Sequence, residues 1–331
     1  MLNNKTILIT GGTGSFGKCF TKYVLTHYQP KKIIIYSRDE FKQFLMQNDF
    51  QEYNKNNQLR FFIGDVRDKA RLQRAMAGVD YVIHAAALKQ VPACEYNPDE
   101  AIKTNIHGAQ NVIDAALDSG TVKKVVALST DKAVNPVNLY GGTKLVSDKL
   151  FIAANAYAGS KDISFSIVRY GNVAGSRGSI IPLFRSIIQN GGTEMPITDY
   201  RMTRFWISLT QGVELVIKAL EEASGGETFI SKIPSFKITD LAEAMCPGCT
   251  LKEIGIRPGE KLHEIMVTVE DSHMTYEYDK HFIVYPQVMW NDRQQINLSG
   301  KKVEEGFSYS SGNNTEWLSV EQIRELLKEV K

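Results

Sequence analysis

A glycine-rich segment near the N-terminus constrains the fold of this chain more than any other feature. Residues 10–17 read Thr-Gly-Gly-Thr-Gly-Ser-Phe-Gly and directly follow the apolar run Thr6–Thr10. Glycines at this spacing allow a tight turn, a close approach to a pyrophosphate and close helix–strand packing, and the helix N-terminus offers amides to phosphates. A plain turn is the alternative, but a position between strand and helix favours a dinucleotide site. The expected cofactor contacts are Gly11, Thr13, Gly14, Ser15, Phe16 and Gly17.

Short apolar runs alternate with longer amphipathic segments through the first half of the chain. The expected strands are Thr6–Thr10, Lys32–Tyr36, Leu59–Ile63, Tyr81–Ala85, Lys124–Leu128 and Ser164–Tyr170. The helices expected between them are Phe16–Thr26, Glu40–Asp49, Lys69–Met76, Asp99–Ser119 and Tyr140–Tyr157. This alternation predicts an α/β fold with a doubly wound parallel Rossmann sheet.

The pattern changes after Tyr170. The sequence predicts a short strand and four helices joined by irregular chain, at Thr228–Ser231 and at Ile180–Gln189, Leu209–Glu222, Thr239–Met245 and Ser319–Val330. We therefore expect a Rossmann domain over residues 1–170, with a return segment near 205–231. Residues 171–204 and 232–331 are expected to form a smaller C-terminal α/β substrate-binding domain.

Composition excludes several classes of protein. A formal net charge of +2 over 331 residues gives no general reason to bind nucleic acid or a membrane surface. No export signal is visible, and no apolar run approaches the roughly 20 residues of a membrane helix. The cysteines are Cys19, Cys94, Cys246 and Cys249. The last two have C-x-x-C spacing but lack a second pair of zinc ligands, so we expect reduced thiols, no metal site and a cytoplasmic protein.

The end of the second expected strand bears on the choice of cofactor. It reads Tyr36-Ser37-Arg38-Asp39, and an arginine at this point accommodates the 2′-phosphate of NADP, whereas an acidic residue would bind the ribose of NAD. NADP is therefore favoured, with Ser37 and Arg38 as contacts, although an exposed arginine is the alternative. Asp65 and Val66 are expected beside the adenine. The small side chains of Ala85 and Ala86 let the cofactor pass closely.

Tyr140 and Lys144 lie four residues apart at the start of an expected helix, so they share one helix face. A phenol has a pKa near 10, too high for a base at neutral pH, and positive charge from Lys144 and a nicotinamide would favour the phenolate. An ordinary helix pair is the alternative. The position beside a nucleotide site instead indicates catalysis, with both residues also contacting the cofactor.

Asp131 and Lys132 follow the fifth expected strand. Neighbouring residues on a strand point to opposite faces, so both reach one ligand only where the chain has left strand geometry. The next residues, 133–138, read Ala-Val-Asn-Pro-Val-Asn and are typical of a loop. A solvated surface pair is the alternative interpretation.

These motifs together resemble the extended short-chain dehydrogenase/reductase family. Within it, Ser129–Pro136 and Asn138–Gly141 are similar to the inverting UDP-N-acetylglucosamine 4,6-dehydratases of pseudaminic acid synthesis. Configuration-retaining dehydratases typically carry Asp-Glu where this chain has Asp131-Lys132. The resemblance implies UDP-N-acetylglucosamine as substrate, tightly held NADP that is regenerated in each turnover, and a homo-oligomer.

The resemblance also implies roles for individual residues. Tyr140 would deprotonate the C4 hydroxyl, Lys132 would remove the C5 proton, and Asp131 would protonate the departing C6 oxygen. The expected substrate contacts are Lys89, Thr130, Asn172, Arg204 and Arg257, the two arginines at the diphosphate unless they are surface residues. Asn105 is similar to an active-site asparagine of the family, or else an exposed helical residue, whereas His84 is expected to be a core histidine.

Three alternatives remain open from the sequence. A nucleotide-sugar 4-epimerase would use Tyr140 and Lys144 but has no need of Asp131 and Lys132. A C5-retaining dehydratase differs only in stereochemistry. A non-catalytic dinucleotide sensor need not keep all four residues.

Overall fold

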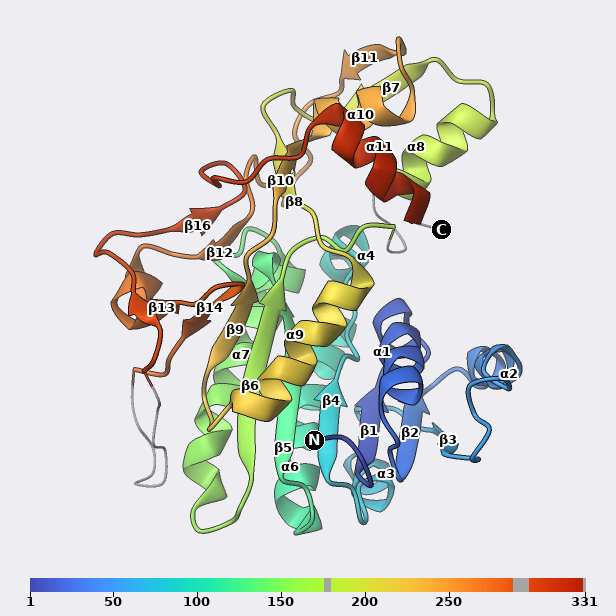
Figure 1. Cartoon of the computed structure of the whole chain (residues 1–331), viewed down its shortest axis with the longest axis vertical. Helices are drawn as coiled ribbons and strands as arrows, with labels where there is room; N and C mark the ends of the chain where they lie inside the picture. The colour runs from blue at the N-terminus through green and yellow to red at the C-terminus, as the bar shows by residue number, and fades with distance from the viewer. Residues whose placement is uncertain (176–179, 288–297, 330–331) are drawn as a thin grey trace.

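The computed structural model describes residues 1–175, 180–287 and 298–329, and its centre is a ten-stranded sheet (Figure 1). The strand order is β15-β13-β14-β9-β6-β5-β4-β1-β2-β3. The strands are β1 (Thr6–Thr10), β2 (Lys32–Ser37), β3 (Leu59–Ile63), β4 (Tyr81–His84), β5 (Lys124–Thr130), β6 (Ser164–Tyr170), β9 (Thr228–Ser231), β13 (Thr275–Glu277), β14 (His281–Val284) and β15 (Lys301–Lys302). The seven strands from β3 to β9 are parallel, which confirms the predicted doubly wound sheet.

Helices cover both faces of this sheet. On the face turned toward the viewer in Figure 1 lie α1 (Ser15–His27) and α9 (Leu209–Glu222). The opposite face carries α3 (Lys69–Ala75), α6 (Gly108–Ser119) and α7 (Leu139–Ala158), while α2 (Glu40–Asp49) lies at the β3 edge. The alternation of side chains along β1 produces this arrangement, because Ile7 and Ile9 pack in one apolar core and Leu8 in the other.

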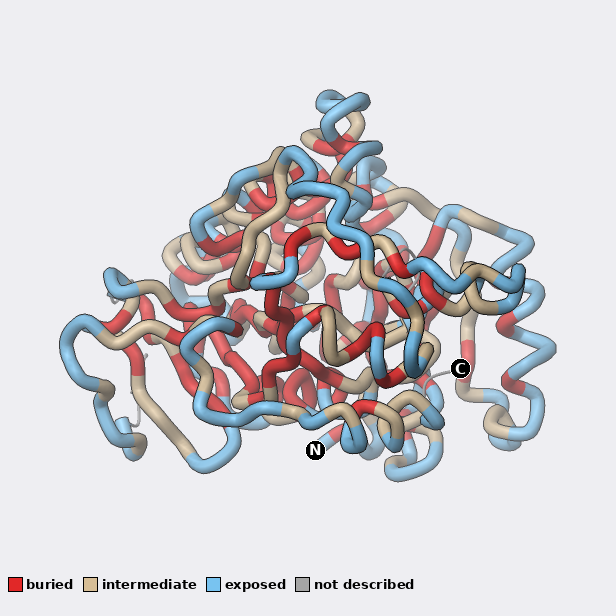
Figure 2. Tube along the Cα trace, turned by 90° about the horizontal axis from the view of Figure 1, so that it is seen from above, coloured by how far each residue is buried: buried red, intermediate tan, exposed pale blue. Residues whose placement is uncertain are grey.

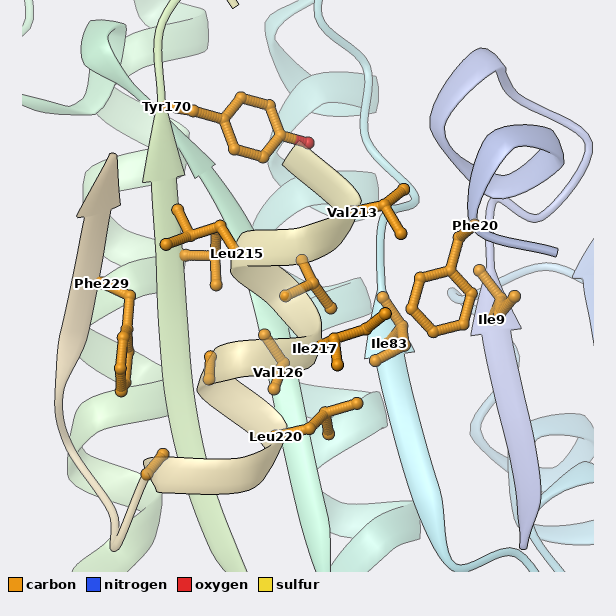
Figure 3. Close-up of a cluster of buried hydrophobic side chains, with 14 of the residues drawn as sticks. Ile9, Phe20, Ile83, Val126, Tyr170, Val213, Leu215, Ile217, Leu220 and Phe229 are labelled. Atoms are coloured by element: carbon orange, nitrogen blue, oxygen red, sulfur yellow. The ribbon is translucent and has the colours of Figure 1, made fainter. Parts of the chain in front are cut away.

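The return of α9 to the first half of the chain is held by apolar packing (Figure 3). Val213, Leu215, Ile217 and Leu220 of α9 lie over the sheet, within the core that contains Phe20 of α1. The helix begins at a capping box in which the Ser208 and Gln211 side chains each accept a hydrogen bond from the other residue's amide. Burial of this face binds residues 209–222 to the Rossmann sheet.

A second, smaller group of elements lies beyond the carboxyl ends of the parallel strands (Figure 1). Its helices are α8 (Ile180–Gln189), α10 (Ile238–Met245) and α11 (Val320–Glu329), and its strands are β7 (Glu194–Ile197), β8 (Thr203–Phe205), β10 (Ser235–Lys237) and β11 (Thr250–Glu253). These elements surround a core that includes Phe184, Trp206, Leu241 and Ile323. Figure 2 shows buried chain in the middle of the molecule and exposed chain mostly around its outside. The division of the chain into two domains near residue 170 stays a prediction.

The tail differs from the irregular chain that was expected. Besides β11, β13, β14 and β15, it forms β12 (Ile265–Val267) and β16 (Tyr309–Ser310), which pair antiparallel. β14 pairs with β9 and extends the main sheet. These strands are two to four residues long, so their side-chain pattern is too short to be recognised in sequence. Val330, the expected end of the last helix, lies outside the described residues.

The single helix expected over Asp99–Ser119 is also wrong. The structure divides it into α5 (Pro98–Ile102), a π-helical turn (Lys103–His107) and α6, and an unpredicted short helix α4 (Val91–Tyr96) precedes them. In the π-turn, Asn105 is buried and bonds the backbone of Leu88 in both directions at 2.8 Å. π-turns of this kind are frequent at functional sites.

The expectation of reduced thiols is wrong for one pair of cysteines. Cys246 and Cys249 form a disulfide directly after α10, where Gly248 has a φ of +76°. The resulting turn brings the two Cα atoms to 5.5 Å, within the range that a disulfide spans. Cys19 and Cys94 are free thiols. In the described parts of the chain, none of the helices combines the length and the apolar character needed to cross a bilayer.

Candidate active site

The glycine-rich loop joins β1 to α1 at the carboxyl edge of the sheet. Gly11 has a φ of +66°, and a Cβ there would lie 2.9 Å from the Ala86 amide nitrogen. Gly17 packs so closely that a Cβ would overlap the Gly12 carbonyl oxygen. Gly14 is the N-cap of α1 and has no side chain to cap the helix, so the first amides remain for a phosphate. Thr13, Ser15 and Phe16 complete this loop and first turn, which we call the cradle, and their contacts with a dinucleotide stay a prediction.

The end of β4 forms the neighbouring wall of the cradle. The amides of Ala85 and Ala86 both donate to Thr10 Oγ1 at 3.2 Å. The same hydroxyl lies 2.9 Å from Nδ1 of His84. Burial, with the charge of Lys144, lowers the pKa of His84 to about 3. His84 is therefore a neutral core histidine that shapes this wall, in line with the expectation from the sequence.

The end of β2 presents the residues predicted to select the cofactor. The Arg38 guanidinium, with 53% of its side chain exposed, lies 3.7 Å from Asp65 Oδ2. Asp39 is directed elsewhere, because its carboxylate caps α2 by accepting from the Lys42 amide at 2.9 Å. Ser37 is buried, and its hydroxyl accepts a hydrogen bond from Gln43. The one acidic side chain next to Arg38 along the chain is thus already engaged in a helix cap.

Asp65 and Val66 follow β3 beside this site. Burial raises the pKa of Asp65, but hydrogen bonds from Arg67 outweigh it and the pKa is lowered overall. The carboxylate is therefore charged and paired with Arg67 and Arg38. Val66 is buried and packs against Gly108, where a Cβ would lie 2.7 Å from Val66 Cγ2.

Tyr140 and Lys144 lie on the first turns of α7, and both are buried. Asn138 caps this helix by accepting from the Gly141 amide at 2.8 Å. Burial raises the pKa of Tyr140 to about 12, against the lowering by Lys132 and by a hydrogen bond with Thr130. Burial also lowers the pKa of Lys144. Before any ligand binds, the positive charge that most favours the phenolate therefore comes from Lys132 rather than from Lys144.

Asp131 and Lys132 lie outside strand geometry, which is the condition for both side chains to reach one ligand. They form a 3-10 turn, Asp131–Ala133, directly after β5. Gly141 allows this turn to lie against α7, because a Cβ there would overlap the Lys132 carbonyl oxygen. The turn brings the two adjacent side chains together, and Lys132 Nζ lies 3.2 Å from Asp131 Oδ1.

Lys132 is the centre of a cluster of charged and polar groups from both halves of the chain. Its ammonium donates to Asn172 Oδ1 at 3.0 Å and to Glu264 Oε1 at 3.2 Å. Arg204 Nε lies 3.6 Å from the same Glu264 oxygen. One carboxylate oxygen of Asp131 and one of Glu264 are buried, and neither has a hydrogen-bond partner among the described residues. We call Asp131, Lys132, Arg204 and Glu264 the charge cluster.

The two carboxylates of the charge cluster are shifted in opposite directions. Burial and the negative charge of Glu264 raise the pKa of Asp131, despite Lys132. Burial also acts to raise the pKa of Glu264, but Lys132 and Arg204 outweigh it and the pKa is lowered. Burial would lower the pKa of Lys132, yet the two carboxylates raise it overall. Two carboxyl groups whose pKa values are shifted in opposite directions offer one proton donor and one fixed anion.

The residues predicted to bind substrate differ in their distance from the charge cluster and in their burial. Thr130 donates to Asp131 Oδ1 at 2.9 Å, and Asn172 accepts from Lys132, so both adjoin the charge cluster. Lys89 is an exposed residue after β4, yet the surrounding protein and the charge of Lys132 lower its pKa. Arg204 is buried and its guanidinium bonds the Thr203 carbonyl oxygen at 2.7 Å. Arg257 is exposed, and its role at a diphosphate stays a prediction, as does that of Arg204.

Two residues of this site were missed in the sequence. Glu264 has no recognisable motif around it, and it lies 132 residues from its partner Lys132. Lys261 donates to the carbonyl oxygen of Val134 and so fastens the tail to the loop after Lys132. Asn138 makes a parallel contact, donating to the Gly259 carbonyl oxygen at 2.8 Å.

Asn105 links two parts of the site. It is buried, which rules out the exposed helical alternative, and its amide donates to Thr143 Oγ1 at 3.0 Å on α7. With its bonds to Leu88, it joins the end of β4 to the helix that carries Tyr140. Asn105 therefore lies next to the helix that carries Tyr140, and an active-site role for it stays a prediction.

The sequence is similar to those of known nucleotide-sugar enzymes. Residues 7–286 match the family described as polysaccharide biosynthesis protein. The UDP-N-acetylglucosamine 4,6-dehydratase (inverting) of Campylobacter jejuni subsp. jejuni serotype O:23/36 (strain 81-176) is 58% identical over 333 residues, covering 99% of this chain and 98% of that enzyme. A UDP-glucose 4-epimerase of Rickettsia canadensis (strain McKiel) is 41% identical over 334 residues, covering 99% and 96% of the two chains.

Among solved structures, Pen from Bacillus thuringiensis matches with a TM-score of 0.89 and 40% identity, and the match covers 99% of each chain. The predicted resemblance to the inverting UDP-N-acetylglucosamine 4,6-dehydratases is thereby confirmed. Because the family match takes in most of the chain and the Campylobacter enzyme aligns with nearly all of it, this protein belongs to the polysaccharide biosynthesis protein family.

Proposed function

We propose that this protein is an inverting UDP-N-acetylglucosamine 4,6-dehydratase. Its product would be UDP-2-acetamido-2,6-dideoxy-β-L-arabino-hexos-4-ulose. The observation that carries the proposal is the convergence of Asp131, Lys132 and Tyr140 at the carboxyl edge of the sheet, supported by 58% identity to a dehydratase of that name over nearly the whole chain. A homo-oligomeric state remains part of the proposal.

A nicotinamide dinucleotide fits the residues at this edge. The backbone at Gly11 and Gly17 leaves no room for a side chain, and the N-terminus of α1 has free amides. When bound, the cofactor would supply the hydride acceptor for C4 and the hydride donor for C6. NADP is our choice because Arg38 is exposed at the end of β2 while Asp39 is engaged as a helix cap. Gly11–Gly17, Ser37, Arg38, Asp65, Val66, Ala85 and Ala86 would hold it, with Tyr140 and Lys144.

Each proton in the reaction has a matching side chain in this chain. Tyr140 takes the C4 hydroxyl proton, which produces a C4 ketone and makes the C5 proton acidic. Lys132 accepts that proton, and Asp131, whose pKa is raised, donates a proton to the C6 oxygen as it leaves as water. Because burial raises its pKa, the Tyr140 phenol stays protonated until a cationic ligand binds next to it and favours the phenolate, which links its activation to the occupied site.

Lys132 must be neutral to act as a base, yet its two carboxylate partners favour the ammonium form. The geometry offers a direct route, because the ammonium proton has only the 3.2 Å contact to Asp131 to cross. That single transfer produces both the neutral amine and the protonated acid that the elimination needs. A quarter of the Lys132 side chain is exposed, and the proposal requires its amine to reach C5 of the bound sugar.

A 4-epimerase is the second candidate, supported by the Rickettsia relatives. Epimerisation involves proton and hydride transfer at C4 alone and has no use for the buried acid beside Lys132. The C5-retaining dehydratase differs in the residue that follows Asp131, which is lysine here. The charge cluster therefore favours dehydration with inversion.

The test is incubation of the purified protein with UDP-N-acetylglucosamine and no added cofactor, followed by mass spectrometry and NMR of the sugar. We expect loss of one water, incorporation of solvent deuterium at C5 and coupling constants of the arabino product. Unchanged mass with a changed C4 configuration would establish the epimerase instead, and the starting C5 configuration would establish retention.

A further inference from the structure

Glu264 is a buried carboxylate that none of the three proton transfers above uses. It lies just before β12, in the second half of the chain, and is 3% exposed. One carboxylate oxygen contacts Lys132 Nζ at 3.2 Å and Arg204 Nε at 3.6 Å, and the other is buried without a hydrogen-bond partner among the described residues. A charged group in this environment is costly unless it is paired, so its position requires an explanation.

The backbone of Glu264 is fixed from both sides. Its amide donates to Ser311 Oγ at 2.9 Å, and its carbonyl oxygen accepts from the Ser311 amide at 2.8 Å. The Ser311 hydroxyl in turn lies 2.8 Å from Thr203 Oγ1, on the strand that carries Arg204. The backbone of Glu264, which directly precedes β12, is therefore fixed to Ser311, which directly follows β16, and through Ser311 to Thr203 of β8.

We propose that Glu264 is a positioning residue for the dehydration step: its buried carboxylate holds Lys132 beside Asp131 and ensures that Asp131, not Glu264, carries the proton to be donated. The inference deepens the proposed function and rests on it. Arg204 is essential to the argument, because its charge next to Glu264 keeps that carboxylate ionised. The ammonium proton of Lys132 then passes to Asp131, although both carboxylates lie 3.2 Å away.

The charges balance through the elimination. Before it, the charge cluster holds a neutral Lys132, a protonated Asp131, an anionic Glu264 and a cationic Arg204. The C5–H electron pair forms the C5=C6 double bond, the C5 proton passes to Lys132, and the C6–O bond breaks as Asp131 protonates the oxygen. Afterwards Lys132 is cationic and Asp131 anionic, so the net charge of the buried cluster is zero at both stages. Without Glu264, the cluster would carry one uncompensated positive charge throughout.

The pH dependence follows from the sign of this charge. A fixed anion raises the pKa of every group beside it, so its removal lowers the pKa of both Asp131 and Lys132. Both limbs of the pH profile for dehydration then move to lower pH. The other ionisable groups that face Glu264 or its partners are Arg204, Lys261, Lys89, Tyr140 and His263.

The experiment compares kcat/KM for water loss across pH in the wild type and Glu264→Gln, with bound cofactor and thermal stability measured in parallel. We expect both limbs of the Glu264→Gln profile to move down by about one to three pH units. Glu264→Asp keeps the negative charge but moves it farther from Lys132. Both limbs of its pH profile should therefore shift in the same direction by less, and its kcat should exceed that of Glu264→Gln. This variant also decides the question if Glu264→Gln does not fold. Glu270→Gln removes an exposed carboxylate six residues along the chain and is the matched control with an unchanged profile.

Limbs that stay at the wild-type pH in folded Glu264→Gln or Glu264→Asp would overturn the inference, even if activity falls, because a purely structural role lowers activity at every pH alike. A wild-type protein that releases no water would instead overturn the proposed function. The two failures are thus separate outcomes of one set of measurements.

Discussion

The dinucleotide cradle and the charge cluster lie at the same edge of the sheet but are built in different ways. The cradle is formed mostly by backbone from one continuous stretch, residues 10–17. Its close packing requires glycine at Gly11 and Gly17, where a Cβ atom would meet neighbouring backbone. The charge cluster is formed by side-chain charges from the turn after β5, from β8 and from the segment before β12. A site made by local backbone can be recognised from spacing alone, whereas a site made by distant charges depends on the whole fold.

The largest effect is expected when a hydroxyl group that transfers a proton is removed while the buried ring that carries it is kept. Tyr140→Phe retains the buried ring and removes the phenol, so we expect kcat for water loss to fall by about 10²–10⁴-fold with the fold unchanged. Product formation is followed by mass spectrometry. Tyr157→Phe, on the same helix but 69% exposed, is the control. Activity of Tyr140→Phe near that of the control would remove Tyr140 from the mechanism.

A substitution at the centre of the charge cluster comes next. Lys132→Ala removes the proposed C5 base and the cation that both buried carboxylates share, so we expect about a 10²-fold loss of turnover and of C5 exchange in deuterated water. Lys123→Ala is the control, because Lys123 lies just before β5 and its partner Asp162 is exposed. If C5 exchange in Lys132→Ala remained at the wild-type rate, another group would have to be the base.

The cradle should instead respond to added volume. Gly17→Ala places a methyl group into the Gly12 backbone, and we expect it to lower the free energy of unfolding by about 1–3 kcal/mol and to reduce cofactor retention. Gly142→Ala is the matched control, since a Cβ there meets no atom within 4 Å. Urea unfolding of both variants measures the difference. Equal effects at the two glycines would contradict the close packing of the cradle.

The smallest effect is expected at the outer end of the cradle. Arg38 is exposed, and its loss should weaken NADP binding by about tenfold and leave NAD binding unchanged. Titration calorimetry on protein stripped of cofactor distinguishes the two ligands. Arg74→Ala, an exposed arginine on α3, is the control. Equal weakening of NAD and NADP by Arg38→Ala would refute the 2′-phosphate contact.

Much of the fold could be predicted because it depends on local pattern. The six strands expected in the first half all form, within two residues of the predicted ends, and the helices over residues 180–189 and 209–222 have the predicted bounds. Periodicity failed where elements are too short to have one, as in β12 and β16. It also failed at the π-turn, where the bonds of Asn105 to Leu88 override a regular helix.

The parallel sheet, the glycine-rich cradle and the candidate residues Asp131, Lys132, Tyr140 and Lys144 could be recognised along the chain, because each is marked by residues that are near neighbours in sequence. The folded structure was needed to find that Glu264 and Arg204 join Lys132, and that the pKa of Asp131 is raised while that of Glu264 is lowered. Burial and charge act through space over a few ångströms, and no spacing along the chain records which distant residues will share them.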